Sequence, residues 1–145
     1  MKTLLTIVLF CSTFFCYSQE DLSNEDNWKI TQNLEHVIIS QRTVEFNDDV
    51  NGVYKEYIQY KFKNKTDKQL FINWDFEFKY SHTSKANSGS DELYRALVLE
   101  PNQNFIPDYY FSNQKSFFVF NKFLKSKIDV HLESVNFKNL KTKTL

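Results

Sequence analysis

The strongest constraint on the fold of this chain is a strict alternation of apolar and polar side chains over Gln69–Tyr80. Every even position in this segment is aromatic or aliphatic: Leu70, Ile72, Trp74, Phe76, Phe78 and Tyr80. The odd positions are polar apart from Phe71. A helix would spread the apolar side chains around its circumference, whereas a strand gathers them on one face. The segment therefore predicts a half-buried strand of an antiparallel sheet.

A second alternating segment precedes it at Tyr54–Asn64, again with its apolar residues at even positions: Tyr54, Ile58, Tyr60 and Phe62. The connection between the two segments, Lys65–Lys68, is short and polar. We therefore expect the two strands to form a hairpin. Tyr60 should then lie opposite Ile72 or Trp74, because the pairing must keep both apolar faces on the same side.

The segment Glu35–Phe46 changes phase along its length. Its apolar residues occupy odd positions at first and even positions later: Val37, Ile39, Val44 and Phe46. We expect a kink near Ser40–Arg42, so that one strand begins in one sheet and continues in another.

Three further strands are predicted downstream, at Leu93–Leu99, Phe117–Leu124 and Ile128–Phe137. The second begins with four apolar residues in succession, which predicts either a strand buried on both faces or a strand with one face covered by a partner. The third loses its phase between Leu132 and Val135, which predicts a bulge. The lysine-rich tail that follows is expected to fray.

About seven strands with polar turns between them, such as Ser81–Glu92, are typical of a two-sheet sandwich. The predicted fold class is all-β: an antiparallel, immunoglobulin-like sandwich that forms a single domain over residues 20–145. A lipocalin-like barrel stays open as an alternative, because its strands also alternate, and it would hold an apolar ligand.

Residues 1–19 have the layout of a secretory signal peptide: Lys2, then the apolar run Leu4–Phe15, then a short polar exit. Cleavage is expected after Gln19, with Ser18 as the alternative. No second long apolar run follows, so the mature chain should have no transmembrane segment. We expect export to the periplasm or the cell exterior. Both cysteines, Cys11 and Cys16, fall in the removed segment, so we expect no disulfide.

The charges of the chain do not favour nucleic acid as a partner. The sequence has 18 basic and 18 acidic residues and no basic stripe that could follow a phosphate backbone.

No metal site is predicted. The segment Asn47–Gly52 begins like a calcium loop, but Ile58 stands where the bidentate glutamate should be, so a simple turn is expected. The three histidines, His36, His82 and His131, are too far apart for a metal-binding spacing.

No catalytic residue and no cofactor are predicted either. Asp75 and Glu77 share the polar face of one strand, at about 7 Å from each other, a separation compatible with glycosidase chemistry. Alternating charges on an outer face are nevertheless the default for a sandwich, and Lys79 continues the row.

Aromatic side chains on expected outer faces are the candidate contacts for a protein or glycan partner: Tyr57, Phe71, Tyr109, Tyr110 and Phe111. Exposed aromatic rings can stack on sugars or anchor a protein. The competing interpretation is that these rings form a second packed face or are covered by a loop.

Three features together carry a resemblance: the signal peptide, the strand–Asn64-Lys65-Thr66–strand unit, and the segment Leu97-Val98-Leu99-Glu100-Pro101-Asn102-Gln103. In these features the chain resembles small immunoglobulin-like sandwich domains exported by Bacteroidota. The resemblance implies the sandwich fold, and it carries no functional residues with it.

These observations favour a non-catalytic binding or structural module at the bacterial cell envelope, acting through a sheet face or edge. Three alternatives stay open. One is a carbohydrate-binding module that uses Tyr109, Tyr110 and Trp74, and another is a lipocalin-like carrier of an apolar ligand. The third is a small hydrolase that uses Asp75 and Glu77.

Overall fold

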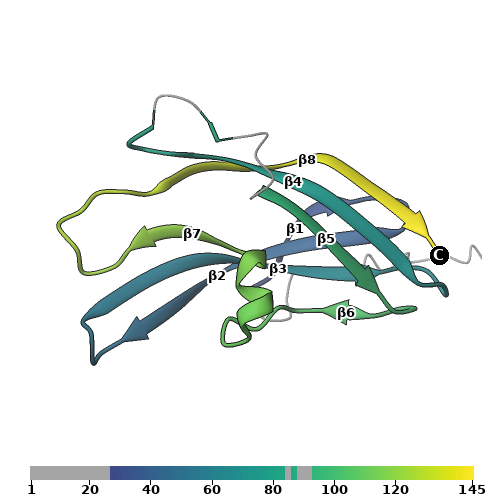
Figure 1. Cartoon of the computed structure of the whole chain (residues 1–145), viewed down its shortest axis with the longest axis horizontal. Coiled ribbons are helices and arrows are strands. Elements are labelled where there is room, and N and C mark those ends of the chain that lie inside the picture. Colours follow the sequence, from purple (N-terminus) through teal and green to yellow (C-terminus); the bar gives the residue numbers. More distant parts are fainter. Residues whose placement is uncertain (1–26, 84–85, 88–92) are drawn as a thin grey trace, which may run out of the picture.

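The computed structural model describes residues 27–83, 86–87 and 93–145. The predicted signal peptide lies outside the described residues. Two antiparallel sheets pack face to face (Figure 1). Their elements in chain order are β1 (Lys29–Asn33), β2 (Val37–Asp48), β3 (Val53–Asn64), β4 (Leu70–Tyr80), β5 (Tyr94–Leu99), β6 (Asn104–Phe105), the 3-10 helix η2 (Ser112–Phe117), β7 (Phe118–Phe123) and β8 (Leu132–Thr144).

Sheet A has the strand order β1-β2-β3-β6, and β7 also pairs with β3, whereas sheet B has the order β5-β4-β8. The predicted all-β, antiparallel two-sheet sandwich is therefore confirmed, with eight strands among the described residues. The lipocalin-like barrel, in which one sheet closes on itself, is not the fold that forms. No helix in the described part of the chain is both long and apolar enough to cross a membrane.

The predicted hairpin of the two central strands is wrong, because β3 and β4 belong to different sheets. Their apolar faces lie against each other: the rings of Tyr60 and Phe76 are 5.6 Å apart and those of Phe62 and Trp74 are 5.0 Å apart. All four side chains are buried, as predicted. In a hairpin the two apolar faces would lie side by side and still need a cover, whereas face-to-face packing buries both at once.

Asn64 directs the chain from sheet A to sheet B. Its fully buried side chain accepts hydrogen bonds from the backbone N–H and the hydroxyl of Thr66, both at 2.9 Å. Its amide group donates to the carbonyls of Lys68 at 2.8 Å and Glu100 at 2.9 Å. One asparagine therefore shapes the turn and ties it to the chain that follows β5.

The predicted change of sheet within β2 is also wrong, although the change of phase is real. β2 pairs with β3 in one continuous register, from Val37 opposite Asn64 to Asp48 opposite Val53. The cover changes instead. In the first half of β2, the odd-numbered residues Val37 and Ile39 pack against sheet B. In the second half, the even-numbered residue Phe46 is covered by residues 107–110, and its ring stacks on that of Tyr109 at 3.9 Å.

The outer face of sheet A is covered by Trp28 where the first half of β2 pairs with the end of β3, and Trp28 lies between two cations. The Arg42 guanidinium is 4.5 Å and the Lys61 ammonium 4.8 Å from the centre of the indole ring. Next to them, the Gln59 amide donates to the carbonyl of Pro107 at 2.7 Å. Sheet A therefore has a cover on both faces.

The last strand begins and ends later than predicted, at Leu132–Thr144 instead of Ile128–Phe137. β8 runs to Thr144 and pairs with β4 along its length, so the lysine-rich tail does not fray. The predicted bulge near Leu132 is confirmed by a register shift opposite Lys79 and Tyr80. The strand predicted over Phe117–Leu124 is confirmed as β7, and its first residues are buried as expected.

Candidate functional site

A groove of about 460 Å³ lies along β5, at the edge of the sandwich. One wall consists of five consecutive residues, Tyr94–Val98. The other wall is formed by Phe105 and by residues of η2, including Ser116 and Phe117. The Arg95 Nε–H donates to the Ser116 carbonyl at 2.6 Å and so joins the two walls. The volume lies within the range of protein ligand sites, which is about 300–1,000 Å³.

β5 has the properties of an unprotected sheet edge. Among the described residues it ends sheet B, with β4 on one side only. It pairs with β4 in one continuous register and contains no lysine. Tyr94 and Val98 point to solvent and are 46% and 48% exposed. An exposed, largely apolar edge without a bulge is a template for pairing with another strand.

β8, at the opposite end of sheet B, is protected by comparison. Its second half has three lysines: Lys138, Lys141 and Lys143. Two register shifts interrupt its pairing with β4, and Asn139 lies in the left-handed region with a φ of 52°. Lysines and bulges are the features by which natural sheets discourage edge pairing. Of the two edges of sheet B, β5 is therefore the one suited to receive a strand.

A second feature is an aromatic cluster on the face of sheet A that is turned away from the core, formed by Phe46, Tyr57, Tyr109, Tyr110, Phe118 and Phe120. Tyr57 and Tyr109 lie with their hydroxyl oxygens 3.3 Å apart. Burial raises the pKa of Tyr57, and its hydrogen bond with Tyr109 adds to the rise. Both side chains are half-buried, because they pack against each other and against Phe46.

The structure brings together three of the five predicted contact residues and separates the others. Tyr57, Tyr109 and Tyr110 belong to the aromatic cluster, where Tyr110 is 84% exposed. Phe111 follows at the start of η2 and is 58% exposed. Phe71 lies in sheet B, opposite Val98 of β5.

Sequence reasoning missed Phe46, Phe118 and Phe120 as members of this cluster. The signals were present in the late change of phase before Asn47 and in the unbroken apolar run of Phe117–Phe120. Trp74, included in the carbohydrate alternative, is fully buried in the core and cannot stack on a sugar.

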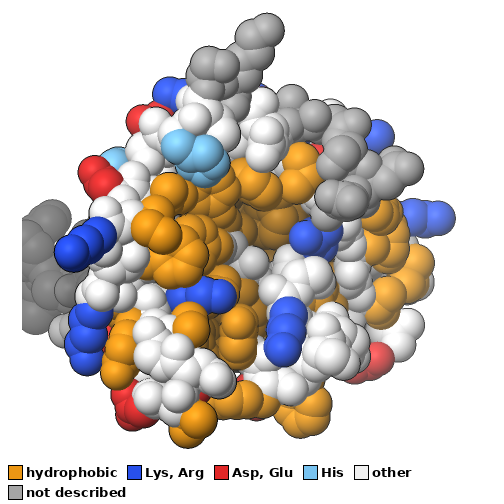
Figure 2. Space-filling view, turned by 60° about the vertical axis from the view of Figure 1, so that its left-hand side comes forward, with side chains coloured by type: hydrophobic (Ala, Val, Ile, Leu, Met, Phe, Trp, Pro, Cys, Tyr) orange, Lys and Arg blue, Asp and Glu red, His pale blue; other side chains and the backbone are white. Residues whose placement is uncertain are grey.

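The hydrophobic surface continues at the end of the molecule formed by the β2–β3 turn and the β7–β8 connection. Figure 2 shows apolar side chains gathered around a hollow on this side, with basic side chains near them. Here Phe120 of sheet A contacts Tyr80 of sheet B. The two rings are 6.0 Å apart, and the Phe120 carbonyl accepts a hydrogen bond from the Tyr80 hydroxyl at 2.8 Å. Burial raises the pKa of Tyr80 to about 12.

The paired carboxylates of β4 take part in cross-strand contacts with β8. Asp75 accepts a hydrogen bond from the Asn139 amide at 2.8 Å, and Glu77 lies 3.2 Å from the Lys138 ammonium. These contacts are typical of an outer sheet face, and they give neither carboxylate the apolar surroundings of a general acid.

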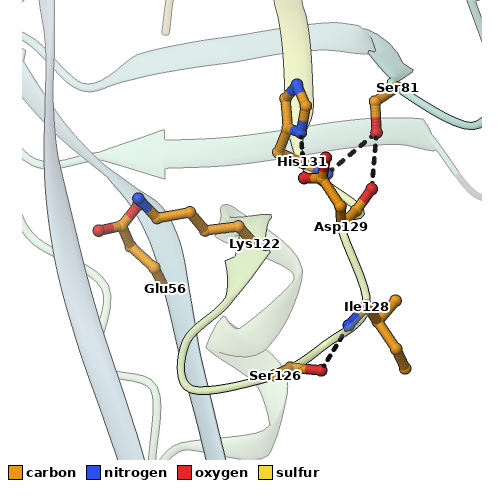
Figure 3. A network of polar contacts seen from close by, with 7 residues as sticks. All are labelled: Glu56, Ser81, Lys122, Ser126, Ile128, Asp129 and His131. Atoms are coloured by element: carbon orange, nitrogen blue, oxygen red, sulfur yellow. Dashed lines mark hydrogen bonds and ion pairs between the residues drawn. The ribbon is translucent and has the colours of Figure 1, made fainter.

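Ser81, Asp129 and His131 lie close together beside β8 (Figure 3). These are the three residue types of a hydrolase catalytic triad. The His131 imidazole contacts the Asp129 carboxylate at 3.1 Å. The Ser81 hydroxyl, however, accepts from the His131 backbone N–H and donates to the Asp129 carbonyl, both at 3.3 Å. A nucleophile needs its hydroxyl on the imidazole, so this network only fixes the connection that enters β8.

Within the segment Asn47–Gly52, the first two residues end β2 and the other four form the predicted turn. The Asp48 carboxylate accepts from the Asn51 backbone at 3.0 Å and from the Asn51 side chain at 2.7 Å, and these bonds lower the Asp48 pKa. Gly52 has a φ of 63°, which glycine adopts without strain. Within the described ranges, no three His, Cys, Asp or Glu side chains are grouped so that they could hold a metal ion.

No protein-family model, curated protein or solved structure matches this chain.

Proposed function

We propose that this chain is a non-catalytic binding module of the bacterial cell envelope that receives an extended segment of a partner protein along β5. The observation that carries the proposal is the groove lined by five consecutive residues of an edge strand without lysine or bulge. The signal-peptide pattern of residues 1–19 supports the location at the envelope.

The groove can accommodate both the backbone and the side chains of an added strand. The backbone of an incoming segment would continue the ladder of sheet B beyond β5. Because side chains alternate along a strand, every second one would point inward, against Leu97, Phe105 and Phe117. The Arg95–Ser116 hydrogen bond holds η2 in place as the far wall.

A strand-like peptide should therefore bind to the purified chain, and a lysine on β5 should prevent it. A suitable probe is a labelled synthetic peptide with the sequence of Tyr94–Glu100, titrated by fluorescence anisotropy. We expect saturable binding to the parent chain and at least about tenfold weaker binding to Val98→Lys, because an edge lysine opposes strand addition.

Val50→Lys is the matched control, since Val50 is 94% exposed in the β2–β3 turn. It should bind the peptide like the parent, and the circular dichroism spectra of both variants should match that of the parent. Equal binding by all three proteins, or no binding by any, would contradict strand addition at β5.

The exposure of Tyr110 favours carbohydrate binding as a second candidate function. Its ring is mostly free of protein contacts and follows Asp108, whose carboxylate accepts from the Tyr110 backbone N–H at 2.9 Å. Exposed rings beside polar groups can stack on sugar rings. On an array of soluble oligosaccharides, Tyr110→Ala should then lose the binding that the parent and Tyr94→Ala retain. A blank array for the parent chain would argue against this candidate.

A further inference from the structure

The exposed face of β5 carries an apolar pair that sheet B shows nowhere else among the described residues. The large hydrophobic side chains exposed in β4, β5 and β8 are Tyr94 and Val98, both on β5. They lie on the same face as Ala96, because alternate residues of a strand share a face. The arrangement is symmetrical about Ala96, with one large apolar residue two positions to either side.

We propose that the strand received along β5 is β5 of a second copy of this chain, paired antiparallel with Ala96 opposite Ala96. This inference rests on the proposed function, since it names the partner for the same edge. In this register Tyr94 lies opposite Val98 of the second copy. By symmetry, Val98 lies opposite Tyr94 of the second copy. Aromatic and β-branched side chains are a favourable cross-strand pair.

The neighbouring strand extends the apolar row. Phe71 lies opposite Val98 in the β4–β5 ladder. Pairing about Ala96 therefore aligns Phe71, Val98 and Tyr94 of the second copy across three adjacent strands. By symmetry the same row forms again from the second copy. This places Phe71, one of the predicted partner contacts, at the interface.

The other registers are less favourable. A shift by one residue would pair the solvent face of one copy with the groove face of the other. A shift by two, with Leu97 opposite Leu97, would place Tyr94 against Glu100 of the second copy. The register about Ala96 keeps each exposed apolar residue against another.

The charges and the groove are compatible with this pairing. Arg95 is the one charged residue of β5, and it would lie opposite Leu97 of the second copy rather than opposite its own counterpart. Leu97 of the second copy would point inward, toward the wall formed by Phe105 and Phe117. Each β5 would therefore close the open side of the other chain's groove, and the two sheets B would form one continuous sheet.

Sedimentation velocity over a concentration series tests the assembly. We expect a reversible monomer–dimer equilibrium for the exported chain and for Val50→Lys. Val98→Lys should dimerise at least about tenfold more weakly, because its lysine would replace both apolar cross-strand contacts.

Cysteine cross-linking tests the register. Ala96→Cys should form an intermolecular disulfide under mild oxidation, because the two substituted positions face each other at the symmetry axis. The control is Ser134→Cys, an exposed position on the lysine-rich strand β8, which should stay uncross-linked. Cys11 and Cys16 fall in the predicted signal peptide, so the parent chain is expected to stay uncross-linked as well.

A chain that stays monomeric at all concentrations but binds the Tyr94–Glu100 peptide would overturn the self-pairing and leave the proposed function standing. A chain that stays monomeric and does not bind the peptide would overturn both the self-pairing and the proposed function. A dimer that persists unchanged in Val98→Lys, or that fails to cross-link through Ala96→Cys, would overturn the self-pairing as well.

Discussion

Replacement of Trp74 by alanine should lower the free energy of unfolding by about 3–5 kcal/mol, the usual cost of removing a large aromatic side chain from a packed core. Trp74 is fully buried. Its ring centre lies 5.0 Å from that of Phe62 in sheet A and 5.7 Å from that of Phe137 in sheet B. It also contacts Phe117, at 6.0 Å, where η2 meets β7. The substitution would therefore open a cavity where both sheets and the wall of the groove meet.

Urea unfolding followed by circular dichroism measures this effect. Tyr110→Ala, the removal of a mostly exposed aromatic ring, is the control and should change stability by at most about 0.5 kcal/mol. Trp74→Phe should cost much less than alanine, because the buried indole N–H has no hydrogen-bond partner among the described residues. A loss of less than about 1 kcal/mol in Trp74→Ala would mean that the two sheets do not pack through this residue.

Asn64→Ala should have the second largest effect, a loss of about 3 kcal/mol, because several hydrogen-bond partners would lose their bonds together. The carbonyls of Lys68 and Glu100 would each lose a donor, and the backbone N–H of Thr66 would lose its acceptor. Asn51→Ala provides a matched control, since Asn51 is an asparagine in an exposed turn. That control should cost well under half as much, as measured by the same urea titration. Equal losses in the two variants would show that Asn64 does not hold the crossing between the sheets.

The variant Asn64→Asp adds a test of the donor role. Its carboxylate would face two backbone carbonyls in a buried site, which raises the pKa of the new acid in the folded state. A raised folded-state pKa means that stability is retained at low pH and is lost as the pH rises through that value. Relative to the parent chain, Asn64→Asp should therefore be less destabilised near pH 4 than near pH 7.

Alternation along the chain predicted which face of β3 and β4 lies in the core, although Gln59, expected to point to solvent, is buried under the cover of the other face. It could not predict that the two faces lie against each other. A period of two specifies the apolar face of a strand but says nothing of whether its neighbour in sequence lies beside it or across the core. That choice depends on distant contacts, such as the bond from Asn64 to Glu100, 36 residues further along the chain.

The candidate site, too, could be predicted from the sequence only in part. The proximity of Tyr109 to Tyr110 follows from their place in one loop, whereas their contact with Tyr57 depends on the packing of that loop against sheet A. The groove could not be predicted, because β5 becomes an edge only through the strand order of sheet B. The sequence does contain the contrast that distinguishes the two edges: Tyr94–Leu99 has no lysine, whereas the second half of β8 has three.

The most direct test of strand addition is amide hydrogen exchange, followed by NMR, with and without the Tyr94–Glu100 peptide. At a protein concentration low enough to keep the chain monomeric, the outward-facing amides of β5 should exchange slowly only when the peptide is present, while exchange in β8 and at Tyr110 and Phe111 stays the same. Slower exchange at Tyr110 and Phe111, or along β8, with β5 unchanged, would contradict β5 as the binding edge.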